Sequence, residues 1–95
     1  MPTMNERLHA VARGHVQGVS YRWFVVRAAQ KLSIVGWTRN GANGRSVEVV
    51  AEGLRSNLEQ LIQKLHDGPP RARVDSVDVS WETTVGDMED FSIRY

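Results

Sequence analysis

The stretch of the chain best suited to chemistry is GHVQGVSYRWF, from Gly14 to Phe24. Gly14 and Gly18 stand four residues apart in it, and Arg22 follows where an apolar helical pattern begins. A helix carries partial positive charge at its N-terminus, so an arginine there is unfavourable unless an anion lies nearby. Amides of a glycine-bearing loop and of a first helical turn bind phosphate or carboxylate. The pattern therefore indicates an anion site, and the planar guanidinium of Arg22 suits two oxygens of the anion.

Asn40 is the second candidate, because asparagine is disfavoured inside strands yet ends the strand-like run before Gly41. Its carboxamide can donate to and accept from a water molecule, which would serve to position a nucleophile. Both candidates also have ordinary interpretations. Asn40-Gly41 commonly begins a loop, and Arg22 could extend into solvent with its stem packed on Trp23 or Trp37.

The histidines do not form a catalytic or metal-binding pattern. His9 lies in a strand-like run and His66 suits a helix C-terminus, whereas His15, in the glycine loop, could add positive charge near an anion. No two of them have a convincing metal-ligand spacing, and no carboxylate pair has a recognisable catalytic spacing. The chain has no cysteine, which excludes disulfides, thiolate metal sites and cysteine nucleophiles.

Length and composition predict one globular domain. The chain has 95 residues, 41% of them hydrophobic, and a formal net charge of +1 from 12 basic and 11 acidic residues. This charge is far from the basic excess of a domain that binds nucleic-acid backbones. No apolar run has the length of a signal peptide or a membrane span. We therefore expect a cytoplasmic protein with neither nucleic acid nor a membrane as partner.

The spacing of apolar residues predicts the elements that position the two candidates. After a flexible N-terminus at 1–6, strands are expected at 7–13, 35–40, 45–52, 73–81 and 91–95, and helices at 22–32 and from about 56 to the stop at 68–70. Asn43-Gly44 predicts a hairpin between the second and third strands. Ser56 and Glu59 have the spacing of a capping box, and Val74 is out of phase, which predicts a bulge near Asp75.

This order of elements predicts an α+β fold for residues 7–95. Two split βαβ units form a ferredoxin-like sandwich, an antiparallel four- to five-stranded sheet with two helices on one face (βαββαβ). In such a fold the glycine loop joins the first strand to the first helix.

Two blocks of the sequence together resemble a known family. GHVQGVSYR at 14–22 resembles the acylphosphatase signature Gly-x-Val-Gln-Gly-Val-x-aromatic-Arg. The second block also matches, namely GWTRN at 36–40 followed by NG at 43–44, VEV at 47–49 and EG at 52–53. GPP at 68–70 and FSIRY at 91–95 resemble later landmarks of the family. The likeness covers nearly the whole chain after its first few residues.

The resemblance implies hydrolysis of acyl phosphates to a carboxylate and inorganic phosphate in a ferredoxin-like domain. By motif position, Arg22 would bind the phosphoryl group and Asn40 would orient the attacking water. The phosphate cradle would be formed by the amides around His15, Val16, Gln17, Gly18, Val19, Ser20 and Tyr21. The family uses no metal or organic cofactor, so none is expected here. We expect a monomer whose partners are a small acyl phosphate and inorganic phosphate, the latter as product and competitor.

Three alternatives remain open at this point. The first is a noncatalytic phosphate- or anion-binding regulatory domain of the same fold. The second is an RNA-binding ferredoxin-like module, although such modules expose paired aromatic residues that the strands here lack. The third is a carbamoyl-phosphate-handling role, as in the acylphosphatase-like domains of hydrogenase-maturation proteins.

Overall fold

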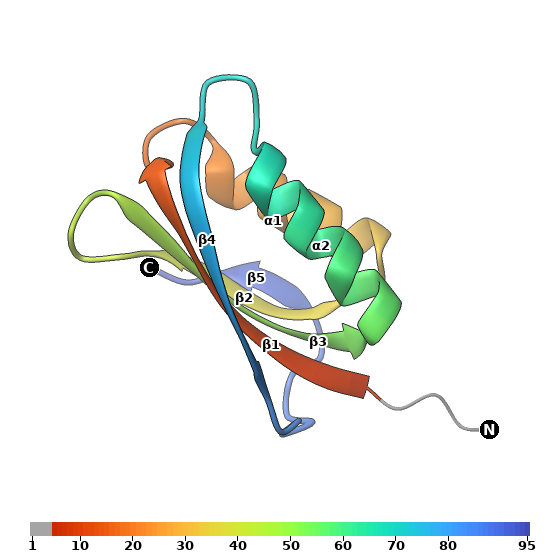
Figure 1. Cartoon of the computed structure of the whole chain (residues 1–95). Coiled ribbons are helices and arrows are strands. Elements are labelled where there is room, and N and C mark those ends of the chain that lie inside the picture. The colour runs from red at the N-terminus through yellow and green to blue at the C-terminus, as the bar shows by residue number, and fades with distance from the viewer. Residues whose placement is uncertain (1–4) are drawn as a thin grey trace.

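The computed structural model describes residues 5–95 and contains two helices and five strands (Figure 1). In chain order these are β1 (Asn5–His15), α1 (Tyr21–Lys31), β2 (Val35–Asn40), β3 (Ser46–Leu54), α2 (Arg55–Asp67), β4 (Arg73–Glu82) and β5 (Phe91–Ile93). Strand β1 includes Asn5 and Glu6, which were expected to belong to the flexible N-terminus. The rest of that expected segment lies outside the described residues.

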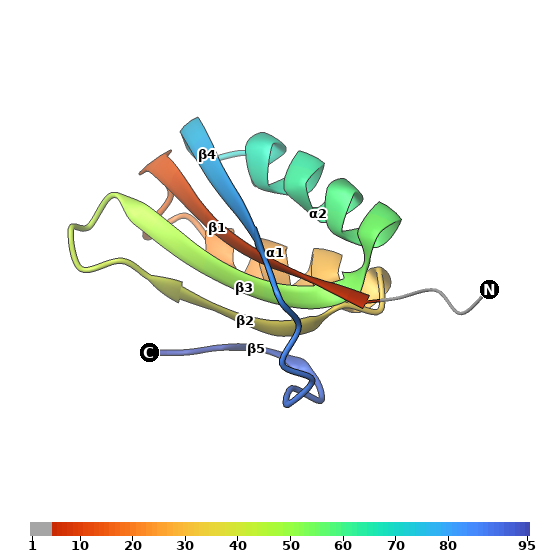
Figure 2. The same cartoon turned by 60° about the horizontal axis from the view of Figure 1, so that its bottom comes forward.

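The five strands form one sheet in the order β4-β1-β3-β2-β5, with both helices on one face (Figures 1 and 2). This confirms the ferredoxin-like α+β prediction. The sheet is mixed rather than wholly antiparallel, because β5 pairs in parallel with β2. Strand β4 lies at one edge and runs opposite to β2. After β4 the chain turns back and crosses to the other edge of the sheet. Strand β5 therefore runs parallel to β2.

The core lies between the sheet and the two helices. Alternate residues of β1 and β3 point to the helical face, as the period of two along a strand requires. The matching apolar residues of the helices recur at helical spacing. The fully enclosed members are Leu8, Ala10, Ala12, Val25, Ala29, Val47, Val49, Ala51, Leu58, Leu61 and Leu65. No helix within residues 5–95 has the length and apolar character needed to cross a membrane.

The capping box expected at the start of α2 is wrong. The helix begins at Arg55, one residue after β3 ends, so its N-cap is Leu54, which makes no side-chain capping bond. Ser56 then falls within the first turn. The carboxylate of Glu59 lies 3.9 Å from the guanidinium of Arg55. The extended N-cap position is thus taken by Leu54, and Ser56, already helical, cannot cap the helix with its hydroxyl. The predicted stop is confirmed, since Gly68 closes α2 by donating to Lys64 O.

Candidate active site

A β-bulge directs the chain from β1 into the glycine loop. The pairing of β1 with β4 shifts between Arg13 and Gly14, and Asp75 is the β4 residue that the shift leaves unpaired, which confirms the predicted bulge. Gly14 adopts a φ of 137°. A Cβ there would overlap the carbonyl of Arg73 and lie 2.9 Å from the Asp75 amide nitrogen. Glycine is required at this position because of this close approach.

The loop leaves the N-terminus of α1 open to an anion. Gly18 and Ser20 both adopt left-handed backbone angles, with φ of 74° and 64°. Ser20 is the N-cap of α1, but its side chain makes no capping bond, and the first turn has no acidic residue. The backbone N–H groups of residues 16–23 donate to no backbone carbonyl within residues 5–95. We call these N–H groups the anion cradle.

A pocket of about 280 Å³ joins the anion cradle to β2. Its lining consists of Val16, Gly18, Ser20, Tyr21, Arg22, Trp23 and Asn40. The two candidates from the sequence, 18 residues apart in the chain, therefore line one hollow. Three of the residues that were expected to form the phosphate cradle, His15, Gln17 and Val19, do not line it.

The carbonyl oxygen of the Asn40 side chain is buried in this region without a hydrogen-bond partner. Within residues 5–95 it is the one buried side-chain polar atom in that condition. Burying an acceptor without a partner costs about 1–3 kcal/mol, so such an atom calls for an explanation. A ligand or water in the pocket would supply the missing donor.

Gln17 fixes the loop rather than lining the pocket. Its side-chain amide donates to Gly41 O and to Ser46 O, at 2.9 Å each, and these carbonyls belong to the two ends of the β2–β3 hairpin. The same hairpin begins directly after Asn40. Gln17 therefore ties the loop of the anion cradle to the segment that carries Asn40.

His15 and Val19, whose amides were expected in the phosphate cradle, do not line the pocket. His15 is the exposed last residue of β1, opposite Arg73 of β4. Val19 is buried and packs in the core. Only the amide of Val19 belongs to the anion cradle, since its side chain points away from solvent. His15, by contrast, lies before the first free amide of the loop.

The expectation that Arg22 could pack on Trp37 is not met, because other arginines occupy that ring. The Cζ atoms of Arg39 and Arg94 lie 5.1 and 4.6 Å from the Trp37 ring centroid. The Cζ of Arg22 lies 5.2 Å from the ring centroid of Tyr95, the last residue of the chain. This cation–π contact holds the guanidinium of Arg22, a half-buried residue that also lines the pocket.

Tyr21 anchors the start of α1 to the end of α2. Its hydroxyl donates to Leu65 O at 2.6 Å, and its side chain is buried. Burial raises the pKa of Tyr21 far above its usual value, so the phenol stays neutral. Tyr21 therefore offers the anion cradle its backbone N–H, while its side chain fixes where the helix begins.

The sequence did not point to Trp23 or Tyr95 as site residues. Trp23 is 58% exposed in the first turn of α1, where it lines the pocket. An exposed tryptophan out of phase with the apolar stripe was the available signal for it. Tyr95 is 73 residues from Arg22 in the chain, and no local pattern links the two.

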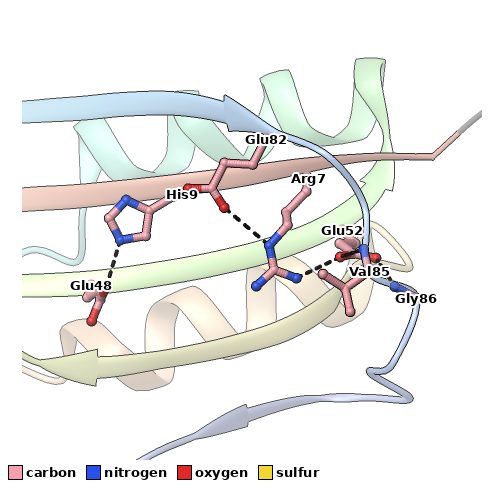
Figure 3. Close-up of polar contacts among 7 residues, drawn as sticks. All are labelled: Arg7, His9, Glu48, Glu52, Glu82, Val85 and Gly86. Carbon is pink, nitrogen blue, oxygen red and sulfur yellow. Dashed lines mark hydrogen bonds and ion pairs between the residues drawn. The ribbon is translucent and has the colours of Figure 1, made fainter.

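The charged residues on the open face of the sheet pair with one another. Glu52 on β3 accepts from Arg7 and from the backbone N–H groups of Val85 and Gly86 (Figure 3). Burial alone would raise the pKa of Glu52, but these hydrogen bonds outweigh it and lower the pKa. Hydrogen bonds from His9 and Arg39 likewise outweigh the effect of burial on Glu48 and lower its pKa. Within residues 5–95, no group of three or more acidic residues and histidines could hold a metal ion.

Comparisons with known proteins agree with the fold and the motifs. The family model for acylphosphatase matches residues 8–93. A protein named acylphosphatase from Dehalococcoides mccartyi (strain CBDB1) is 44% identical over 93% of this chain and 97% of its own length. A protein of the same name from Anaeromyxobacter sp. (strain Fw109-5) is 47% identical over 94% of this chain and 95% of its own length. The crystal structure of acylphosphatase from Bacillus subtilis has a TM-score of 0.90 and 33% identity, over 97% of this chain and all of that one.

Proposed function

The chain belongs to the acylphosphatase family and hydrolyses acyl phosphates, and we propose that Arg22, Asn40 and the anion cradle carry out this reaction. The substrates are mixed anhydrides of a carboxylic acid with phosphoric acid. The products are a carboxylate and inorganic phosphate. Water attacks phosphorus, the bond from phosphorus to the acyl oxygen breaks, and the carboxylate leaves with the electron pair.

The anion cradle and Arg22 bind the phosphoryl group. Phosphoryl transfer spreads negative charge over three equatorial oxygens in its transition state, so donors fixed in advance around them lower the barrier. The N–H groups of residues 16–23 are such donors. The guanidinium of Arg22 lines the same pocket and adds a full positive charge with a planar pair of N–H groups.

Asn40 orients the attacking water. Its buried Oδ1 accepts a hydrogen bond from that water, which directs a lone pair of the water at phosphorus, in line with the departing carboxylate. No carboxylate or histidine of residues 5–95 lines the pocket. We infer that the water's proton passes to a phosphoryl oxygen of the substrate. A carboxylate is a good leaving group, so its departure needs no general acid.

One observation supports this assignment above the others: the unpartnered Asn40 Oδ1 belongs to a residue that lines the same pocket as Arg22. An acceptor for water and a cation for phosphate are the two groups that the reaction requires. Inorganic phosphate fits the same donors, so we propose that it is both product and competitive inhibitor. That the protein is a monomer, lies in the cytoplasm and acts without nucleic acid stays a prediction from the sequence.

Benzoyl phosphate tests the proposal, because its loss is followed by ultraviolet absorbance. We expect the wild-type protein to hydrolyse it at a rate that a chelator leaves unchanged, and Arg22→Ala to lose both binding and turnover. Arg22→Lys should restore little, since an ammonium cannot reproduce the guanidinium fork. A protein that binds inorganic phosphate through Arg22 but leaves benzoyl phosphate intact would be the noncatalytic anion-binding domain instead.

A further inference from the structure

A second and larger hollow adjoins the pocket that holds Arg22. Its volume is about 630 Å³, and it runs along α1 toward the end of α2. Ser20 and Trp23 line both hollows, so the two adjoin at these residues. We call it the basic groove, after the residues that line it beyond this junction: Phe24, Arg27, Lys31 and Lys64.

The basic groove combines an aromatic entrance with positive charge farther along. Trp23 is 58% exposed and Phe24 is half-buried, so both rings can contact a ligand beside the pocket. Arg27 and Lys31 follow at one and two helical turns from Trp23, about 6 and 12 Å along the axis. Lys64 comes from the last turn of α2.

The cations of the basic groove have no acidic partners within the described chain. Residues 5–95 contain nine ion pairs shorter than about 4 Å, and none includes Arg27, Lys31 or Lys64. Nor does any described acidic residue line the groove. Most arginines elsewhere on the surface are paired, so this cluster stands apart as a surface complementary to an anion.

We propose that the basic groove is the acyl subsite and that it favours acyl phosphates whose acyl group carries a second negative charge at its far end. This inference rests on the proposed function, which places the phosphoryl group at Arg22. With that group in the cradle, the acyl carbon points out of the pocket past Trp23. An apolar or aromatic acyl group then contacts Trp23 and Phe24, and its distal anion reaches Arg27 and Lys64.

Two substrates that differ only in the distal charge test this inference. The probes are benzoyl phosphate and 4-carboxybenzoyl phosphate, and the measurement is the ratio of their kcat/KM values. We expect wild type to prefer the carboxylated substrate by about fivefold or more, as two partly screened ion pairs predict. The preference should decrease at high salt. A third probe, 4-phosphonooxybenzoyl phosphate, carries a distal phosphate in place of the carboxylate. Whichever of the two anionic substrates has the higher kcat/KM shows whether the groove prefers a distal phosphate or a distal carboxylate.

Matched charge variants separate the groove from the overall charge of the protein. In Arg27→Gln/Lys64→Gln the preference should fall to about one. The control Arg13→Gln/Arg55→Gln removes the same two charges from the open face of the sheet and the opposite end of α2, and should keep the preference. No preference in wild type, or an undiminished one in Arg27→Gln/Lys64→Gln, would overturn the assignment. Failure to hydrolyse benzoyl phosphate at all would instead reject the proposed function.

Discussion

Asn40 and Arg22 contribute to the pocket in different ways, one neutral and one charged. The carboxamide of Asn40 has a buried oxygen with no partner among the described residues, whereas the guanidinium of Arg22 already contacts the ring of Tyr95. A group whose hydrogen bond is left for a ligand contributes little to folding. Substitutions of the two residues should therefore change catalysis more than stability. The difference should be clearest for substitutions of Asn40.

For Asn40→Ala we predict a fall in kcat of about 100-fold or more, with a much smaller change in KM, because water positioning acts in the chemical step. Stability should be unchanged or higher by up to about 1–3 kcal/mol, since within residues 5–95 no hydrogen bond to Asn40 Oδ1 is lost and a buried, unpartnered acceptor is removed. Steady-state kinetics with benzoyl phosphate and thermal unfolding measure both. Turnover close to wild type would remove Asn40 from the mechanism.

At the residue scale, the sequence pointed to two groups within its motif blocks, and the structure places both of them at one pocket. Arg22 followed from a cation placed at a helix N-terminus, and Asn40 from the second block of the family. Gln17 was expected to supply a cradle amide, but the hold of its side chain on the hairpin was not expected, because it depends on a contact with Ser46, 29 residues away. Such long-range contacts have no signature in the local pattern.

At the scale of elements, the bulge between β1 and β4 sets the direction in which the anion cradle opens. Gly14 lies against the backbone of Arg73 and Asp75, while at Gly18 no heavy atom of the described residues lies within 4 Å of where a Cβ would stand. The two glycines of the motif thus serve different purposes. Gly14 permits close approach of a neighbouring strand, and Gly18 permits a left-handed turn.

These roles predict unequal costs of adding a methyl group. Gly14→Ala should lower the free energy of unfolding by about 3 kcal/mol or more, because β4 must move. Gly18→Ala should lower it by only about 1–2 kcal/mol, the cost of a left-handed angle with a Cβ. Urea unfolding of the two variants measures both values. Equal losses, or a larger loss for Gly18→Ala, would contradict the role given to the bulge.

Most elements were predictable because their apolar periods are strong. The helices and the first four strands follow from spacing, and the out-of-phase Val74 located the bulge. The capping box failed because Ser56 and Glu59 match the pattern while the chain enters α2 one residue earlier. The parallel pairing of β5 was also missed, since a three-residue strand carries too little pattern to fix its partner.

At the scale of the whole molecule, Glu52 joins β1 to the connection that leads from β4 to β5. The connection from β4 to β5 crosses from one edge to the other (Figure 2), and Glu52 accepts from two of its amides while pairing with Arg7 at 2.7 Å. Glu52 is 3% exposed, so these bonds are shielded from water. The connection has no helix or strand of its own, and Glu52 supplies its link to the middle of the sheet (Figure 3).

The lowered pKa of Glu52 makes part of the stability dependent on pH. A carboxyl whose pKa is lower in the folded state stabilises the fold above its ordinary value of 4.5, and this contribution is lost as the pH falls through the lowered pKa. We predict that Glu52→Gln loses about 1–3 kcal/mol of unfolding free energy at neutral pH. Below pH 4.5 the stability of this variant should also fall less steeply than that of wild type. Part of the fall should remain, because the pKa of Glu48 is lowered as well.

Glu82→Gln is the matched control, because Glu82 also pairs with Arg7 but at 3.3 Å and 46% exposed. Its loss should be under about 1 kcal/mol. Urea unfolding from neutral pH to about pH 3 compares the variants with wild type. Equal effects of Glu52→Gln and Glu82→Gln would mean that the connection is not held by Glu52.

Binding of inorganic phosphate, followed by the amide resonances of 15N-labelled protein, tests the anion cradle most directly. We predict one saturable site, with the largest shifts at residues 16–23 and with the whole response lost in Arg22→Ala. If the largest shifts fell elsewhere on the chain, or if Arg22→Ala bound phosphate as tightly as wild type, the loop and its arginine would not be the phosphoryl site.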